Sequence, residues 1–127
     1  MNEVERIKRA LKRNKFVEFA YLYGSQSRGE AGARSDWDIA VRFSKDPSDL
    51  PPWTAFYLEA EISREIGEEV HVVALNVIGS PVFLFQVING IVLADRKTEK
   101  RILFEADVLR RYHDWGYYLK RHIVKSL

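Results

Sequence analysis

Hydrophobic and polar positions follow two different periods along this chain. In residues 2–14, apolar side chains recur at helical spacing between lysines and arginines, which predicts an amphipathic helix. Residues 16–23 are apolar or aromatic at every position except Glu18, which is typical of a strand in the centre of a sheet. In residues 36–43 every second position is apolar, which predicts a strand with one distinctly apolar face.

The rest of the chain continues to alternate between helix and strand patterns. We expect a helix ended by a glycine, then a strand, a short apolar helix, a short edge strand and a long last helix. Their ranges are 52–67, 69–75, 81–88, 91–94 and about 98 to the end. On the last helix, four residues lie near one stripe: Leu103, Ala106, Leu109 and His113.

This order of elements predicts an α+β fold, close to α/β, in which a mixed sheet carries helices packed mainly on one face. The chain has 127 residues, of which 46% are hydrophobic and 13% aromatic, enough for one compact core. The loop at residues 44–52 is rich in turn residues but too short for a linker between domains. We therefore expect residues 1–127 to form a single domain.

Composition and charge exclude several classes of protein. The chain has no cysteine, which excludes disulfides, thiolate metal sites and cysteine nucleophiles. Its 20 basic and 18 acidic residues give a net charge of +2, so nucleic acid is not expected as a direct ligand. No segment approaches the roughly 20 apolar residues of a membrane span, and the charged N-terminus lacks an apolar signal core. These features favour a cytoplasmic protein without membrane contact.

Gly24 and Ser25 follow the first predicted strand, at a place suited to a phosphate-binding turn. A glycine lets the backbone turn sharply and approach a phosphate closely. We expect Ser25 to open a short helix, whose N–H groups and dipole favour an anion. The Ser25 hydroxyl adds a donor, and Arg28, one turn later, could reach the same phosphates. These three residues are the candidate nucleotide-binding set.

Asp36 and Asp38 come next, with ten residues between Ser25 and Asp36. Side chains two apart on a strand point to the same side, so these carboxylates repel each other unless a cation lies between them. Mg²⁺ takes oxygen ligands and is commonly shared between carboxylates and substrate phosphates. Two such ions about 4 Å apart can activate an attacking hydroxyl and stabilise a leaving pyrophosphate. Asp36 and Asp38 are therefore candidate metal ligands and catalytic residues.

These residues belong to a stretch that resembles the signature of the DNA polymerase β-type nucleotidyltransferase superfamily, YLYGSQSRGEAGARSDWDIAVRF. It is most similar to the minimal nucleotidyltransferases (MNT) of bacteria and archaea. EEVHVVALN stands where that family has its third catalytic strand, and the later segments SPVFLFQVINGIVLADR and FEADVLRRYHDW also resemble it. The resemblance implies the nucleotidyltransferase fold and, with Mg²⁺ as cofactor, transfer of AMP from ATP to a hydroxyl.

The resemblance also implies a protein partner. Relatives of this size are often antitoxins, which pair with a small helical HEPN ribonuclease and inactivate it by adenylylating a tyrosine. The expected partners are therefore ATP and a HEPN-type toxin. Three tyrosines of the last helix could pack against a partner helix or could be ordinary amphipathic positions: Tyr112, Tyr117 and Tyr118. The sequence leaves the oligomeric state open, a homo-oligomer included.

His71 departs from the family's pattern, which has a third aspartate at this position. A neutral imidazole could act as a base, since histidine titrates near working pH. It could also ligate a metal, although it suits transition metals better than Mg²⁺, or be a hydrogen-bonded strand residue without catalytic duty. Glu69, two residues earlier on the same strand face, could replace the acid in part. We include His71 with Asp36 and Asp38 as a candidate catalytic residue.

Two functions of different classes follow from these observations. The first is an enzyme, a protein adenylyltransferase that acts as an antitoxin. The alternative, motivated by the missing third aspartate, is a catalytically impaired module of the same fold that binds nucleotide or neutralises its partner by contact. An adenylyltransferase for small molecules would need a further helical domain to hold the acceptor, and only one helix is expected after residue 97.

Overall fold

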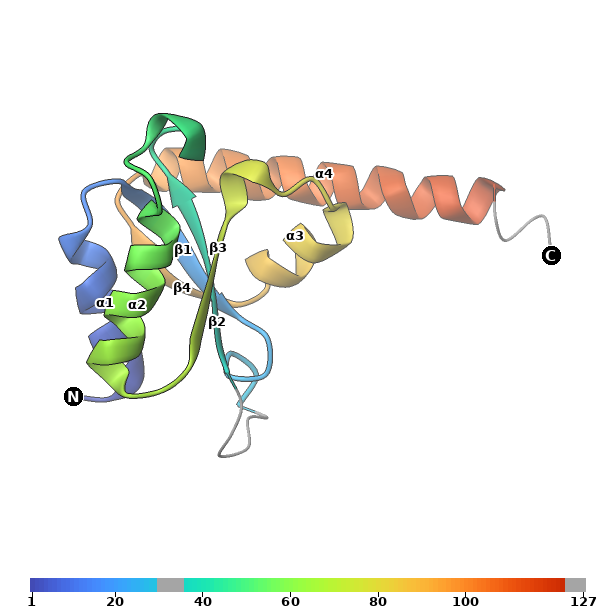
Figure 1. Cartoon of the computed structure of the whole chain (residues 1–127). Helices are drawn as coiled ribbons and strands as arrows, with labels where there is room; N and C mark the ends of the chain where they lie inside the picture. Colours follow the sequence, from blue (N-terminus) through green and yellow to red (C-terminus); the bar gives the residue numbers. More distant parts are fainter. Residues whose placement is uncertain (30–35, 123–127) are drawn as a thin grey trace.

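The computed structural model describes residues 1–29 and 36–122, which form a four-stranded sheet and four α-helices (Figure 1). These elements begin and end within two residues of their predicted bounds, which is the usual uncertainty of element ends. The last residues of the predicted final helix, 123–127, lie outside the described residues. The elements are α1 (Glu3–Arg13), β1 (Val17–Tyr23), β2 (Trp37–Phe43), α2 (Thr54–Ile66), β3 (Val70–Ala74), α3 (Pro81–Ile88), β4 (Ile91–Asp95) and α4 (Thr98–His122), with short 3-10 turns η1 (Pro47–Asp49) and η2 (Leu75–Val77).

The sheet has the strand order β3-β2-β1-β4 and is mixed, as predicted. β1 runs antiparallel to both β2 and β4, whereas β2 and β3 are parallel. β4 lies at one edge of the sheet, as expected, and β3 lies at the other. At that second edge, Val72 donates its N–H to the carboxylate of Glu59 on α2, with an N···O distance of 2.8 Å. This contact satisfies a backbone group that an edge strand would otherwise leave open.

Helices cover both faces of the sheet, which corrects the expectation that they would pack mainly on one face. α1 and α2 cover the face that carries Ala20, Leu22 and Ile39, whereas α3 and α4 cover the face that carries Phe19 and Tyr21 (Figure 1). The reason lies in β1, whose apolar residues point alternately to both sides of the sheet. Two hydrophobic clusters therefore form, because both faces of such a strand must be removed from water.

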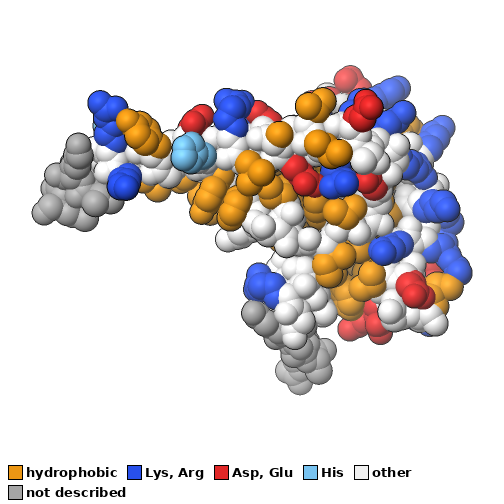
Figure 2. All heavy atoms as spheres, turned by 180° about the vertical axis from the view of Figure 1, so that it is seen from behind, with side chains coloured by type: hydrophobic (Ala, Val, Ile, Leu, Met, Phe, Trp, Pro, Cys, Tyr) orange, Lys and Arg blue, Asp and Glu red, His pale blue; other side chains and the backbone are white. Residues whose placement is uncertain are grey.

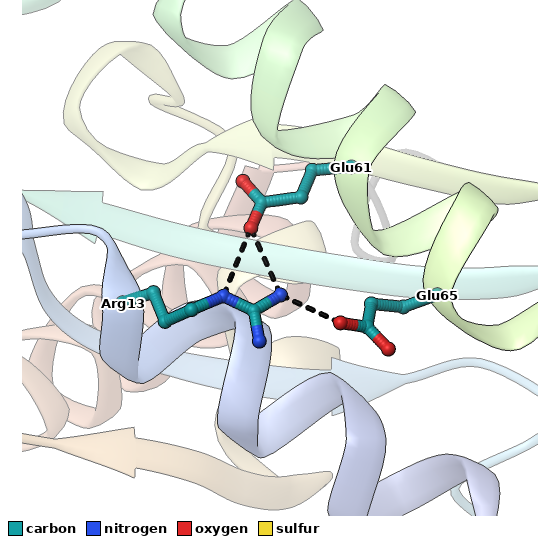
Figure 3. Close-up of polar contacts among 3 residues, drawn as sticks. All are labelled: Arg13, Glu61 and Glu65. Carbon is teal, nitrogen blue, oxygen red and sulfur yellow. Dashed lines mark hydrogen bonds and ion pairs between the residues drawn. The ribbon is translucent and has the colours of Figure 1, made fainter.

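α1 and α2 lie side by side, and Figure 3 shows Arg13 of α1 pointing toward two glutamates of α2. Its guanidinium contacts Glu61 at 3.0 Å and Glu65 at 2.7 Å. The hydrogen bond from Arg13 lowers the pKa of Glu65. Because these side chains are partly open to solvent, the contact orients the two helices more than it stabilises them. The stability comes from the apolar cluster beneath, where Ile7 and Ile62 are fully buried.

α4 is attached to the sheet by its first half and then continues past it (Figure 1). Val108 is its buried residue, and the half-buried Phe104 packs against Phe19 with ring centroids 5.4 Å apart. The stripe that the sequence indicates on α4 is not its buried side, because all four of its residues are exposed: Leu103, Ala106, Leu109 and His113. Apolar residues occur on several sides of this helix, so their spacing alone could not select the buried side. No helix in the described ranges, α4 included, has the length and apolar character needed to cross a bilayer.

The buried hydroxyl of Tyr21 links β1 to α4 by donating to Glu105 Oε2 at 2.5 Å. Burial raises the pKa of Tyr21, so the hydroxyl stays protonated and remains a donor. We expect Tyr21→Phe to lower the free energy of unfolding by about 1 kcal/mol, the usual net contribution of one hydrogen bond. Urea unfolding measures the loss, and Tyr57→Phe is the matched control because Tyr57 is exposed. Equal stability of the two variants would contradict the role of this contact.

Candidate functional site

The end of β1 brings a glycine directly against an aspartate of β2. Tyr23, the last residue of β1, pairs with Asp38, and Gly24 follows with a φ of +77°. A Cβ atom at Gly24 would lie 2.6 Å from Asp38 Oδ2, closer than real side chains approach. Glycine is therefore required here for two reasons, the positive φ and the close approach to a carboxylate.

Residues 24–29 form consecutive hydrogen-bonded turns, which corrects the expectation of a short helix beginning at Ser25. The last three N–H groups of this segment donate to carbonyls three residues earlier. Ser27 Oγ also donates to the Gly24 carbonyl at 2.7 Å, a side-chain bond that competes with helical pairing. Gly29 has a φ of +69°, outside the helical range. An anion at this place would therefore meet turn amides and not the end of a helix.

A cluster of titratable side chains forms where β2 and β3 begin. The two strands are parallel, with Asp38 opposite His71, and Trp37 donates its N–H to the Glu69 carbonyl at 3.1 Å. This pairing places His71 Nε2 3.1 Å from Asp36 Oδ2 and 3.5 Å from Glu69 Oε1. One ligand atom each of Asp36, Glu69 and His71 lies within 4.8 Å of the ligand atoms of the other two. All three side chains are partly exposed, so an ion from solvent could reach them.

Asp38 lies beside this cluster, with its carboxylate against Gly24. Burial raises the pKa of Asp38, while His71 opposes that rise and the Asp36 carboxylate adds to it. Burial also raises the pKa of the Tyr23 hydroxyl to about 12, with a further contribution from Asp38. The negative charges at this end of the sheet therefore oppose one another, and a bound cation would relieve that repulsion.

Other residues, some predicted and some not, lie on the elements that carry this centre or on their immediate neighbours. Ser25 and Arg28, from the candidate nucleotide-binding set, lie on the turn after β1, where Ser25 is half-buried and Arg28 exposed. Sequence reasoning missed Tyr23, although its place directly before the glycine was an available signal. It also missed Glu59, which holds β3 beside the cluster through the N–H of Val72. No spacing indicates that contact, because it depends on how α2 packs against the sheet edge.

The Asp36–Glu69–His71 cluster supplies two carboxylates and one imidazole, groups that bind divalent metal ions. Atoms about 2.1 Å from a metal ion lie about 3.0 Å apart at a right angle and about 3.4 Å apart at a tetrahedral angle. The contacts of 3.1 and 3.5 Å match those separations. Asp38 adds a further carboxylate on the side of the turn. The arrangement therefore suits metal-assisted chemistry on an anionic substrate.

Known proteins resemble this chain over most of its length. The sequence profile of the family described as "Polymerase beta, Nucleotidyltransferase" matches residues 5–99. A chain from a crystal structure of a toxin–antitoxin complex with AMP-PNP is 23% identical, with a TM-score of 0.77, over 99% of this chain and 98% of that one. A second match is a chain from the structure of a tri-AMPylated Shewanella oneidensis HEPN toxin in complex with MNT antitoxin. It is 21% identical, with a TM-score of 0.71, over 98% of this chain and 95% of that one.

A protein described as a minimal nucleotidyltransferase is 23% identical, with a TM-score of 0.56, over 72% of this chain and 94% of that one. A search of curated proteins found no match. The solved structures confirm the nucleotidyltransferase fold predicted from the sequence. The family profile spans the segment from α1 to the first residues of α4, and so includes Gly24, both aspartates and β3. This chain therefore belongs to the polymerase β-type nucleotidyltransferase family.

Proposed function

We propose that this chain moves AMP from ATP to a tyrosine hydroxyl of a HEPN-type toxin in the cytoplasm, and that it thereby acts as the antitoxin. Membership of the family supports nucleotidyl transfer. Similarity to chains from toxin–antitoxin complexes, one with AMP-PNP and one with an AMPylated toxin, supports the choice of substrate and partner. The observation that carries the proposal is the contact of Gly24 with Asp38 beside the Asp36–Glu69–His71 cluster.

Each candidate residue has a distinct task in this proposal. Asp36 and Asp38 would hold the Mg²⁺ that accompanies ATP, and the turn after Gly24 would meet the phosphates. The glycine permits the backbone to approach closely, while Ser25 and Arg28 offer side-chain donors. Bound Mg²⁺ supplies positive charge that neutralises the phosphates and the leaving pyrophosphate.

The transfer is a displacement at the α-phosphorus of ATP. The acceptor oxygen of the tyrosine bonds to that phosphorus while the bond to the bridging oxygen breaks, and pyrophosphate leaves with the electron pair. The hydroxyl proton passes to a base at the site. His71 could accept this proton or ligate a metal ion. Nε2, the atom that faces Asp36 and Glu69, cannot hold a proton and a metal ion at once, so it fills one of these roles at a time.

The shape of the molecule offers a place for a partner protein. Figure 2 shows a concave side between the projecting half of α4 and the end of the sheet that carries the 24–29 turn. Tyr112 stacks on Phe85 of α3, with ring centroids 3.9 Å apart, so this side of α4 faces α3. Trp115 and Tyr118 continue along α4 beyond that contact and are exposed. A helical partner that packs against the projecting half of α4 would contact these exposed aromatic residues.

We expect the double substitution Trp115→Ala, Tyr118→Ala to weaken toxin binding at least about tenfold, because a few aromatic anchors dominate the affinity of most interfaces. Titration calorimetry against the purified toxin measures the change. The control is Phe56→Ala, Tyr57→Ala, another exposed aromatic pair, on a helix that covers the opposite face of the sheet. Unchanged affinity in the α4 variant would place the interface elsewhere.

The proposed activity is tested by incubating the chain with α-labelled ATP, Mg²⁺ and a HEPN-type protein encoded by a neighbouring gene. We expect label on a tyrosine of that protein, located by mass spectrometry of its peptides. The absence of transfer with several divalent metal ions and several acceptors would contradict the enzymatic role.

A second candidate function is neutralisation by contact alone, and the contact between His71 and Asp36 favours it. At 3.1 Å, a protonated imidazole could hold the Asp36 carboxylate in an ion pair and weaken its capacity to bind metal. In that case an Asp36→Ala, Asp38→Ala double variant would neutralise the toxin as well as the wild type does. If this variant still formed the complex but no longer neutralised the toxin, the result would favour the enzyme.

A further inference from the structure

We infer that Asp36, Glu69 and His71 form a binding site for a first-row transition metal ion of the Mn²⁺, Co²⁺ and Zn²⁺ class, in preference to Mg²⁺. The inference rests on the proposed function in one respect, because Asp36 would be shared between this ion and the Mg²⁺ that arrives with ATP. The site would then take two metal ions of different chemistry.

The donor set decides the preference. Mg²⁺ favours oxygen ligands in near-octahedral geometry and gives up its water reluctantly. An imidazole nitrogen binds transition metal ions more strongly, and their affinity for a site of nitrogen and oxygen ligands rises from Mn²⁺ toward the later metals. A histidine placed against two carboxylates therefore adds affinity for these ions and little for Mg²⁺.

The protein backbone holds the three ligands in place before any ion binds. Glu69 and His71 lie on one side of the sheet at the start of β3, whose pairing with β2 sets Asp38 opposite His71. The Glu69 carbonyl accepts the N–H of Trp37 at 3.1 Å, which fixes residue 69 next to Asp36. Ligands held on two paired strands need little rearrangement to bind an ion.

On the outer side of β3, the Glu59 carboxylate of α2 accepts the N–H of Val72, the residue after His71. β3 is thus fixed from both sides at the position of the imidazole. The His71 Nε2 atom and the two carboxylate oxygens consequently converge on one space, with separations of 3.1 and 3.5 Å from the nitrogen.

Charge also favours an added cation. Asp36 and Glu69 contact the imidazole directly, and Asp38 lies opposite it on the neighbouring strand. A protonated His71 would bring one positive charge to three carboxylates, which leaves most of their repulsion in place. A divalent ion with a neutral imidazole as ligand neutralises more of it. The competing explanation, a protonated histidine that forms only ion pairs, predicts no metal binding here.

Co²⁺ is the probe for this site, because its visible absorption reports the ligands around it, and the titration needs neither ATP nor toxin. We expect the full chain to bind Co²⁺, Zn²⁺ to displace it, and a large excess of Mg²⁺ to leave the absorption unchanged. His71→Ala should weaken Co²⁺ binding about 100-fold or more, since even the outer partners of metal ligands contribute about 10- to 100-fold. His113→Ala, which removes an exposed histidine of α4, is the control.

Two further variants keep the test decisive if His71→Ala is poorly folded. His71→Asp restores a carboxylate at this position and should bind metal with a much smaller preference for Co²⁺ over Mg²⁺. Glu69→Gln should weaken Co²⁺ binding, whereas Glu68→Gln, one residue away and outside the cluster, should not. Displacement of Co²⁺ by equimolar Mg²⁺ would overturn the inference. So would unchanged Co²⁺ binding in folded His71→Ala, or an unchanged preference for Co²⁺ over Mg²⁺ in His71→Asp.

The metal site and the proposed activity can fail separately. Co²⁺ binding that depends on His71, without AMP transfer under any condition, would contradict the proposed function and support the metal site. AMP transfer with Mg²⁺ by a chain that binds no Co²⁺ through His71 would support the proposed function and contradict the metal site.

Discussion

Asp38→Asn is expected to reduce the proposed AMP transfer to a HEPN-type toxin about 1000-fold or more. A metal ion that neutralises reacting phosphates contributes several kcal/mol to the transition state, and each 1.36 kcal/mol corresponds to about a factor of ten in rate. Asparagine keeps the shape of the side chain against Gly24 but loses the negative charge that would bind the cation. Single-turnover transfer from α-labelled ATP measures the effect.

The same variant is expected to unfold at a temperature equal to or above that of the wild type. Burial raises the pKa of Asp38, so at neutral pH its charged form is less favourable in the folded than in the unfolded chain. Removing the charge removes that cost, and stability and activity should therefore move in opposite directions. Asp49→Asn, at an exposed aspartate of η1, is the matched control and should change neither. If Asp38→Asn lost stability together with activity, its role would be structural.

The strands that carry the site could be predicted because their apolar patterns are strong. The alternation in β2 indicated that Asp36 and Asp38 lie on one side, and in the structure Ile39 and Val41 are buried on the other. The placement of the helices was harder to predict. Because β1 has apolar residues on both of its sides, helices must cover both faces of the sheet. The order of the elements alone does not indicate this. In α4, several apolar residues remain exposed, so the spacing of apolar residues does not indicate which side of the helix is buried.

The contacts within the site were predictable only in part. Glu69 and His71 share a strand face by the two-residue period, as expected, but their approach to Asp36 depends on the parallel register of β2 and β3. That register is fixed by backbone pairing, including the bond from Trp37 to residue 69, and no residue spacing encodes it. The turn after β1 illustrates the same limit, because local features accompany turns there in place of the expected helix: the bond from Ser27 Oγ to the Gly24 carbonyl and the positive φ of Gly29.

Gly24→Ala is expected to impair both stability and catalysis, for two separable reasons. A residue with a Cβ at a φ of +77° costs about 1–2 kcal/mol in the left-handed region. The new Cβ would also meet Asp38 Oδ2 at 2.6 Å and would have to displace that carboxylate. A displacement of about 1 Å at a reacting centre can lower the rate about 100-fold. Urea unfolding measures the first effect, and transfer from α-labelled ATP measures the second.

Gly67→Ala separates these two effects. Gly67 follows α2 with a φ of +70°, close to that of Gly24, but a Cβ there would meet nothing within 4 Å. This variant should lose a similar amount of stability and keep full AMP transfer, so the ratio of the two transfer rates isolates the contact with Asp38. If Gly24→Ala transferred AMP as fast as Gly67→Ala, the close approach of the turn to Asp38 would be irrelevant to the reaction. The phosphate-binding role proposed for that turn would then have to be abandoned.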